Sequence, residues 1–155
     1  MNQKTYVILI LLLLVSVGRS QAPVLTIEQA ETVLQFYLND HFPDYPPAGI
    51  RIYPNDRHYA LRLDIRLETT VDISLIIDLF DAIDNVCQYA RDTISVYTVI
   101  THKPDQITPT IFEAEASCTA ALFRYKNLSR RNWLGTCLIR RESLAPYSLT
   151  PTNQP

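Results

Sequence analysis

The segment from His58 to Glu68 constrains the fold more than any other part of the sequence. Its apolar residues alternate with charged ones: Tyr59, Leu61, Leu63, Ile65 and Leu67 against Arg62, Asp64, Arg66 and Glu68. A repeat of two residues is the period of a β-strand, whose side chains point alternately to opposite faces of a sheet. We therefore predict a strand in a sheet with one buried face and one face in contact with water.

Two segments carry the longer repeat of amphipathic helices. The first begins at Thr26, which forms a capping-box pattern with Gln29, and ends near His41 or Phe42 because Pro43 follows. The second runs from about Asp72 to Arg91, with a broad apolar stripe at Ile73, Ile76, Ile77, Phe80, Ile83, Val86, Cys87 and Ala90. Its opposite side, which we interpret as a solvated face, carries Asp78, Asp81, Asp84 and Gln88.

Further strands complete the pattern. We predict strands at residues 50–53 and 93–101, and at residues 133–140 a strand or a short helix followed by one. Residues 111–125 fit both periods; we favour a strand there, and a helix is the alternative. The order α-β-β-α-β-β(-β) predicts an α+β fold in which two helices pack on one face of an antiparallel sheet of four or five strands.

Residues 1–20 have the pattern of a signal peptide. Lys4 precedes an apolar run of about 12 residues, and the small residues Gly18 and Ser20 precede Gln21. As a helix this run spans about 18 Å, whereas the hydrocarbon core of a bilayer is about 30 Å thick. We predict a cleaved signal peptide and a secreted or periplasmic protein. The alternative is an uncleaved N-terminal membrane anchor with the domain outside the cytoplasm. We expect membrane association only through such a segment.

The rest of the chain is predicted to form one α+β domain at residues 21–145 and a flexible tail at residues 146–155. Charge is unevenly distributed along it. Residues 21–92 carry 12 acidic and 5 basic side chains, net −7, and residues 93–155 carry 4 acidic and 7 basic ones, net +3. The sum, −4, is too mild to indicate nucleic acid as a partner.

Six basic residues fall in an 18-residue stretch without an acid: Arg124, Lys126, Arg130, Arg131, Arg140 and Arg141. We interpret the uneven charge as the solvated faces of one domain. The alternative is a basic patch for an anionic surface, for a partner or for the acidic face of another copy.

Several chemistries lack the residues they need. The chain has three glycines, two of them after residue 20, and no phosphate-binding loop, dinucleotide fingerprint or serine nucleophile elbow. The histidines, at positions 41, 58 and 102, and the cysteines have no zinc-finger spacing. We therefore expect no cofactor, no metal and no catalytic residue, and an enzyme is the less favoured interpretation.

Three cysteines in an exported chain leave one thiol unpaired. Cys87 lies on the apolar stripe of the second helix, whereas Cys118 and Cys137 lie in consecutive elements joined by a polar turn. We predict a disulfide between Cys118 and Cys137 and a buried Cys87 that acts as a small apolar residue.

Four residues form the candidate interaction surface: Tyr45, in a proline-rich connection, and Arg130, Arg131 and Trp133. For Trp133 we favour packing in the core or at its rim, and a place on this surface is the alternative. Asn127 opens an N-glycosylation pattern, Asn127-Leu128-Ser129. We expect an exported, non-catalytic interaction or accessory domain whose partner is a protein or an anionic cell-surface component. The alternative is a small extracytoplasmic hydrolase or ligand-binding protein whose active site is not visible in the sequence.

Overall fold

The computed structural model describes residues 24–68, 72–104 and 106–142. The predicted signal peptide at residues 1–20 and the predicted tail at residues 146–155 lie outside these residues.

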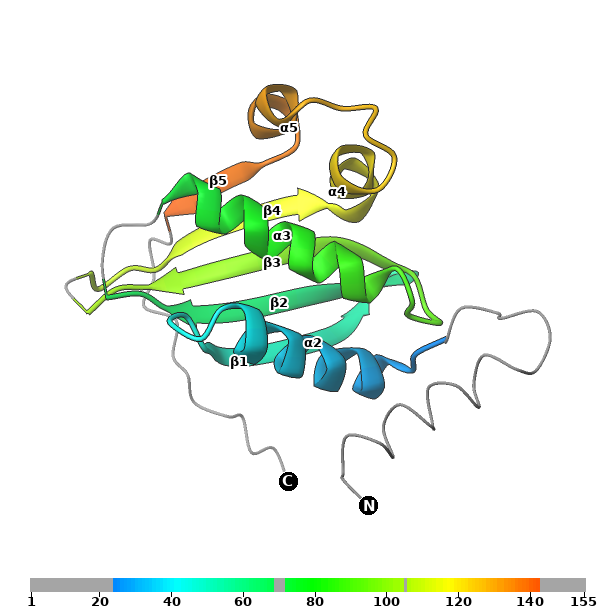
Figure 1. Cartoon of the computed structure of the whole chain (residues 1–155), viewed down its shortest axis with the longest axis horizontal. Helices are drawn as coiled ribbons and strands as arrows, with labels where there is room; N and C mark the ends of the chain where they lie inside the picture. Colours follow the sequence, from blue (N-terminus) through cyan, green and yellow to red (C-terminus); the bar gives the residue numbers. More distant parts are fainter. Residues whose placement is uncertain (1–23, 69–71, 105, 143–155) are drawn as a thin grey trace, which may run out of the picture.

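The described residues form an α+β fold with the element order that the sequence predicts, extended by two short helices (Figure 1). In chain order the elements are α2 (Ile27–His41), β1 (Pro47–Asn55), β2 (His58–Arg66), α3 (Ile73–Cys87), β3 (Ile94–His102), β4 (Thr110–Glu115), α4 (Ala116–Phe123), α5 (Arg130–Thr136) and β5 (Ile139–Glu142).

The five strands form one sheet in the order β1-β2-β3-β4-β5. Three of the four neighbouring pairs are antiparallel, as predicted, but β2 and β3 are parallel, with Leu63 opposite Val99. The sheet is therefore mixed rather than wholly antiparallel. The reason is the connection: α3 lies between β2 and β3 in the chain and carries it back along the sheet, so that both strands start at the same end.

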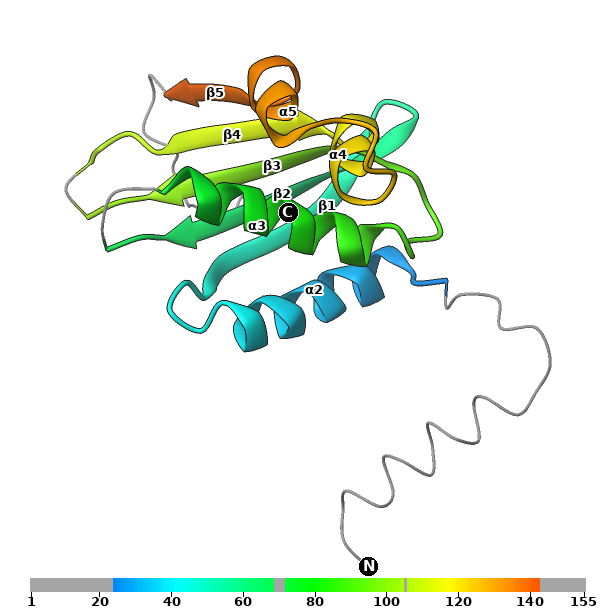
Figure 2. The same ribbon diagram turned by 45° about the horizontal axis from the view of Figure 1, so that its top comes forward.

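The helices α2 and α3 cover one face of the sheet, as predicted, with α2 on the side of β1 and α3 across the middle (Figures 1 and 2). The two additional helices, α4 and α5, lie on the other side of α3, towards β4 and β5. As a result α3 has neighbours on three sides: the sheet, α2 and α4.

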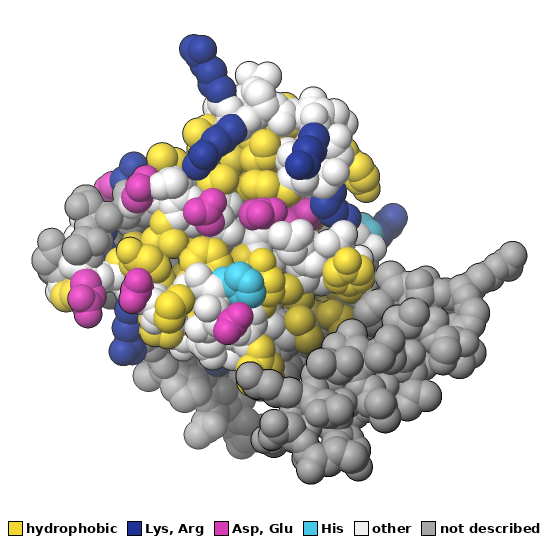
Figure 3. Space-filling view, viewed as in Figure 1, with side chains coloured by type: hydrophobic (Ala, Val, Ile, Leu, Met, Phe, Trp, Pro, Cys, Tyr) yellow, Lys and Arg dark blue, Asp and Glu magenta, His cyan; other side chains and the backbone are white. Residues whose placement is uncertain are grey.

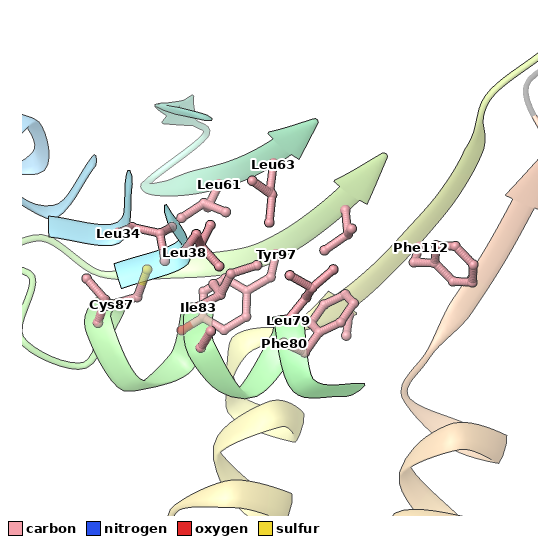
Figure 4. Packing of buried hydrophobic residues seen from close by; sticks show 14 of the residues in the cluster. Leu34, Leu38, Leu61, Leu63, Leu79, Phe80, Ile83, Cys87, Tyr97 and Phe112 are labelled. Carbon is pink, nitrogen blue, oxygen red and sulfur yellow. The ribbon is translucent and has the colours of Figure 1, made fainter. Parts of the chain in front are cut away.

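The alternation in β2 has the predicted consequence. Leu61, Leu63 and Ile65 are fully buried and pack with Leu34 and Leu38 of α2 and with Leu79, Phe80 and Ile83 of α3 (Figure 4). On the opposite face, Arg66 is exposed.

The ends of the two long helices follow the capping pattern of the sequence. Thr26 and Gln29 form the predicted capping box, and α2 ends at His41. The carboxylate of Asp72 accepts a hydrogen bond from the backbone N–H of Ser74 at the start of α3. This helix ends at Cys87, earlier than predicted.

Residues 111–125 are divided between two elements. The predicted strand is right as far as Glu115, where β4 ends, and wrong beyond it, because Ala116–Phe123 is helix α4. The sequence fits both the strand repeat and the helix repeat because the first half of the segment is a strand and the second half is a helix. In residues 133–140 the structure has the predicted alternative of a short helix followed by a strand, α5 and then β5.

The strand β1, longer than predicted, forms one edge of the sheet, and its outer side carries few free donors. Pro47 and Pro54 have no backbone N–H, and the N–H of Ile52 donates to the Glu31 carboxylate of α2. This edge is therefore partly closed to a further strand.

The buried face of β2 generates a stability prediction. Leu63→Asp places an unpaired carboxylate where the side chain is fully buried, so unfolding should cost about 4 kcal/mol less, enough to unfold many domains. Arg66→Ser, on the exposed face three positions along, should stay within about 0.5 kcal/mol of the wild type. Urea denaturation measures both, and equal midpoints would contradict the assignment of the two faces.

Candidate functional site

A buried carboxylate lies at the centre of the helical layer. Asp84 of α3 has no exposed surface, although the sequence placed it on a solvated face. That prediction is wrong because α4, in a segment for which the sequence favoured a strand, packs against this side of α3. Asp78, on the same predicted face, is exposed, and Asp81 is half-buried.

Three donors satisfy the Asp84 carboxylate. The Arg124 side chain donates from Nε to Oδ2 at 2.7 Å and from Nη2 to Oδ1 at 3.1 Å. The hydroxyl of Tyr97, in β3, donates to Oδ1 at 3.2 Å. This cluster joins α3, the sheet and the end of α4 through one side chain.

Burial and hydrogen bonding act in opposite directions on this carboxyl. Removal from water raises the pKa of Asp84, and the hydrogen bonds from Arg124 and Tyr97 lower it less than burial raises it. Burial, together with the negative charge of Asp84, also raises the pKa of the Tyr97 hydroxyl. The cluster has the character of a structural anchor, because Arg124 and Tyr97 both donate to the carboxylate and the carboxylate is buried away from solvent.

The cysteines are arranged as the sequence predicts. Cys118, in the first turn of α4, forms a disulfide with Cys137, which follows α5, and their Cα atoms are 6.1 Å apart. Cys87 is a free, buried cysteine on α3. Burial raises the pKa of its thiol, which disfavours the thiolate that nucleophilic or redox chemistry requires.

The disulfide closes an excursion between two neighbouring strands. Antiparallel neighbours such as β4 and β5 can be joined by about two to five residues. Here residues 116–138, including α4 and α5, lie between them. The excursion contains four basic residues and no acid: Arg124, Lys126, Arg130 and Arg131.

The structure separates the residues of the predicted interaction surface. Arg130 and Arg131 are exposed in the first turn of α5, but Trp133 is fully buried between Phe80 of α3 and Phe123 of α4. Tyr45 lies in the connection from α2 to β1, on the opposite side of α3 (Figure 1). The exposed aromatic residue of the excursion is Tyr125, which sequence reasoning did not select.

A cleft of about 650 Å³ opens where α3 ends and β3 begins, next to the junction of β4 and α4. Its charged lining comprises Arg91, Asp92, Glu115 and Arg124, with His58 beside them. The thiol of Cys87 lies on its wall but has a raised pKa, and the guanidinium of Arg124 is held by Asp84.

A second polar cluster lies on the sheet face away from the helices. Asp64 Oδ2 accepts a hydrogen bond from Arg62 Nε at 2.7 Å, and Asp64 Oδ1 lies 3.0 Å from His102 Nε2. Burial raises the pKa of this carboxyl, but the hydrogen bonds from Arg62 and His102 outweigh it and the pKa is lowered. Within the described residues, no hydroxyl or thiol hydrogen-bonds to His102.

The sequence signals Arg62 and Asp64 as neighbours on one face of a strand. It does not signal His102, because that contact depends on the parallel pairing of β2 with β3. Across the described part of the chain, no group of three or more His, Cys, Asp or Glu side chains could hold a metal ion. Among the same residues, no helix is long and apolar enough to cross a membrane.

Comparison of the chain with protein-family models, with curated proteins and with solved structures gave no match.

The buried ion pair predicts a pH-dependent variant. Arg124→Leu leaves Asp84 buried without its cation and should lower the free energy of unfolding at pH 7 by about 3 kcal/mol. The loss should be smaller near pH 4. A carboxyl whose pKa is raised by folding binds a proton more readily in the folded chain than in the unfolded one. The free energy of unfolding therefore falls as the pH rises above the pKa that this carboxyl has in the unfolded chain.

Urea denaturation at the two pH values measures this effect. The double variant Asp84→Leu with Arg124→Leu should regain much of the loss, since neither charge is then buried alone. A loss that is independent of pH and unchanged in the double variant would show that the pair does not anchor α4.

The cysteine arrangement predicts a pattern of thiol reactivity. Folded protein should show no rapidly alkylated thiol at neutral pH, and protein unfolded without reductant should show one per chain, from Cys87. Cys118→Ala with Cys137→Ala should cost about 3 kcal/mol of stability, whereas Cys87→Ala should cost less. A fast-reacting thiol in the folded state would contradict this arrangement and favour an enzyme.

Proposed function

We propose that this protein is an exported, non-catalytic interaction domain that presents the α4–α5 excursion (residues 116–138) as a preformed basic contact surface. The observation that carries the proposal is the construction of this excursion. It is longer than its strands require, it is closed by a disulfide, and all four of its charged residues are basic.

Rigidity supports a binding role. The disulfide holds both ends of the excursion, Arg124 attaches it to buried Asp84, and Trp133 packs into the core beneath it. A surface fixed in this way loses little conformational entropy when it binds. Arg130 and Arg131 project from it and are exposed.

The partner should be acidic: a protein or an anionic component of a cell surface. Export is supported by the N-terminal pattern and by the disulfide, which persists in oxidising compartments. Asn127 is exposed in the loop between α4 and α5 and would be the acceptor in a host that glycosylates it.

A second candidate function is binding of a small ligand. It is supported by the cleft of about 650 Å³ at the end of α3, a volume within the range of small-molecule sites. This candidate does not need the exposed arginines of α5, so the two functions can be separated by mutation.

Charge reversal on α5 tests the proposed function. Arg130→Glu with Arg131→Glu changes the net charge by four units without touching a buried side chain. Arg51→Glu with Arg57→Glu makes the same change on exposed residues of β1 and its turn and is the matched control. We expect wild type and control, but not the α5 variant, to retain the same component in affinity capture from a native extracytoplasmic fraction.

Retention should also decrease as salt screens the charges. Capture of the same component by all three proteins would overturn the proposal, provided that the circular dichroism of the α5 variant is that of the wild type. Capture that persists in the α5 variant but fails when the cleft residue Ser117 is replaced by Arg would favour the second candidate.

A further inference from the structure

The surface of α2 is acidic and has no cation of its own. Residues 24–50 contain Glu28, Glu31, Asp40 and Asp44 and no Lys or Arg. Glu31 is engaged with the backbone of β1, whereas the other three are exposed. Within the described residues, none of the three forms a salt bridge with Lys or Arg, and Asp40 lies 3.6 Å from its neighbour His41.

An exposed aromatic side chain accompanies these acids. Phe36 is 71% exposed and Val33, three residues before it on the same helix, is 40% exposed. Asp40 follows Phe36 by four residues and therefore lies on the same side of α2. We define the α2 face as Val33, Phe36 and Asp40 of α2, together with exposed Asp44 of the connection that follows this helix. An exposed apolar centre with a charged rim is a common composition for a protein contact site.

The α4–α5 excursion has the complementary composition. Tyr125 is 68% exposed, with the Arg124 guanidinium 5.6 Å from its ring centroid, and the other charged residues of the excursion are Lys126, Arg130 and Arg131. Figure 3 shows Lys and Arg side chains gathered at the α4–α5 end, with acidic side chains over the helical layer below it.

Three acids on or just before α3 have a basic side chain of the excursion near them. Asp84 binds Arg124, and the charges of Lys126 and Arg130 act on Asp81 and Asp72, respectively. The acids of α2 are too far from the excursion for the same role. This helix packs on β1, at one edge of the sheet, whereas the excursion joins β4 to β5 at the other edge.

We infer that the acidic partner of the excursion is a second copy of this chain, which docks through its α2 face. This inference rests on the proposed function and names its partner. The two surfaces differ, so each contact leaves one α2 face and one excursion free. Such head-to-tail contacts form a ring where the rotation closes and an open chain where it does not.

Charge exchange between two variants tests this inference. In the first, Asp40→Lys with Asp44→Lys reverses the α2 face; in the second, Arg130→Glu with Arg131→Glu reverses the excursion. All four side chains are exposed. Each variant alone presents like charges on both surfaces and should stay monomeric. An equimolar mixture should assemble, because the lysines on the α2 face of the first variant can bind the glutamates on the excursion of the second.

Sedimentation velocity over a range of protein concentrations, with matched circular dichroism spectra, provides the readout. Wild type should assemble at low ionic strength and dissociate as salt approaches about 1 M, where charges are screened beyond about 3 Å. Phe36→Ser should weaken assembly at every salt concentration, since it removes the apolar centre of the contact.

A wild type that remains monomeric at low salt, or a mixture that does not assemble although both variants are folded, would overturn the inference. In that case, capture of another component that still depends on Arg130 and Arg131 would leave the proposed function in place. Loss of both results would overturn the two proposals together.

Discussion

The position of the helices depends on the buried carboxylate of Asp84. A carboxylate with no exposed surface is tolerated when cations or hydrogen-bond donors satisfy it, and here Arg124 and Tyr97 do so from two different elements. Removing the Arg124 side chain leaves Oδ2 of this buried carboxylate without its donor and the charge without its cation. The pair therefore fixes where α4 sits against α3, and with it the start of the excursion that follows.

This pair also explains the uneven distribution of charge along the chain. The acidic helix α3 and the basic excursion are separate in sequence but adjacent in space, and part of the negative charge of the first half is balanced by the second half. The interpretation of two solvated faces is thus incomplete. One acidic helix is an internal counterpart of the excursion, and within the described residues Glu28 and Asp40 of α2 form no salt bridge with Lys or Arg.

The sequence predicted helices and strands correctly wherever a single repeat of apolar residues ran through a whole segment. The alternation of β2, the capping box at Thr26 and the stripe of α3 each reported local geometry, and the two cysteines in consecutive elements indicated their disulfide. Residues 111–125 were assigned only in part, because the repeat of apolar residues changes from that of a strand to that of a helix at Ala116. This change occurs in the middle of an alanine-rich segment without Gly or Pro to mark a turn. The strand interpretation of residues 116–123 also led to the wrong environment for Asp84, since helix α4 is what buries this side chain. The contact of His102 with Asp64 and the place of Trp133 between α3 and α4 do not follow from any local pattern, because they depend on which strands pair and on which helix covers which side.

The two edges of the sheet differ in how they meet other chains. Along β1, two prolines and the carboxylate of Glu31 remove donors that an added strand would need. The opposite edge, β5, has four residues, all exposed, and three of them are charged: Arg140, Arg141 and Glu142. Growth of this sheet by continuous stacking, as in a fibril, requires two receptive edges, and here one is partly closed and the other is short and charged. At high protein concentration the sheet backbone is therefore kept out of contacts between copies.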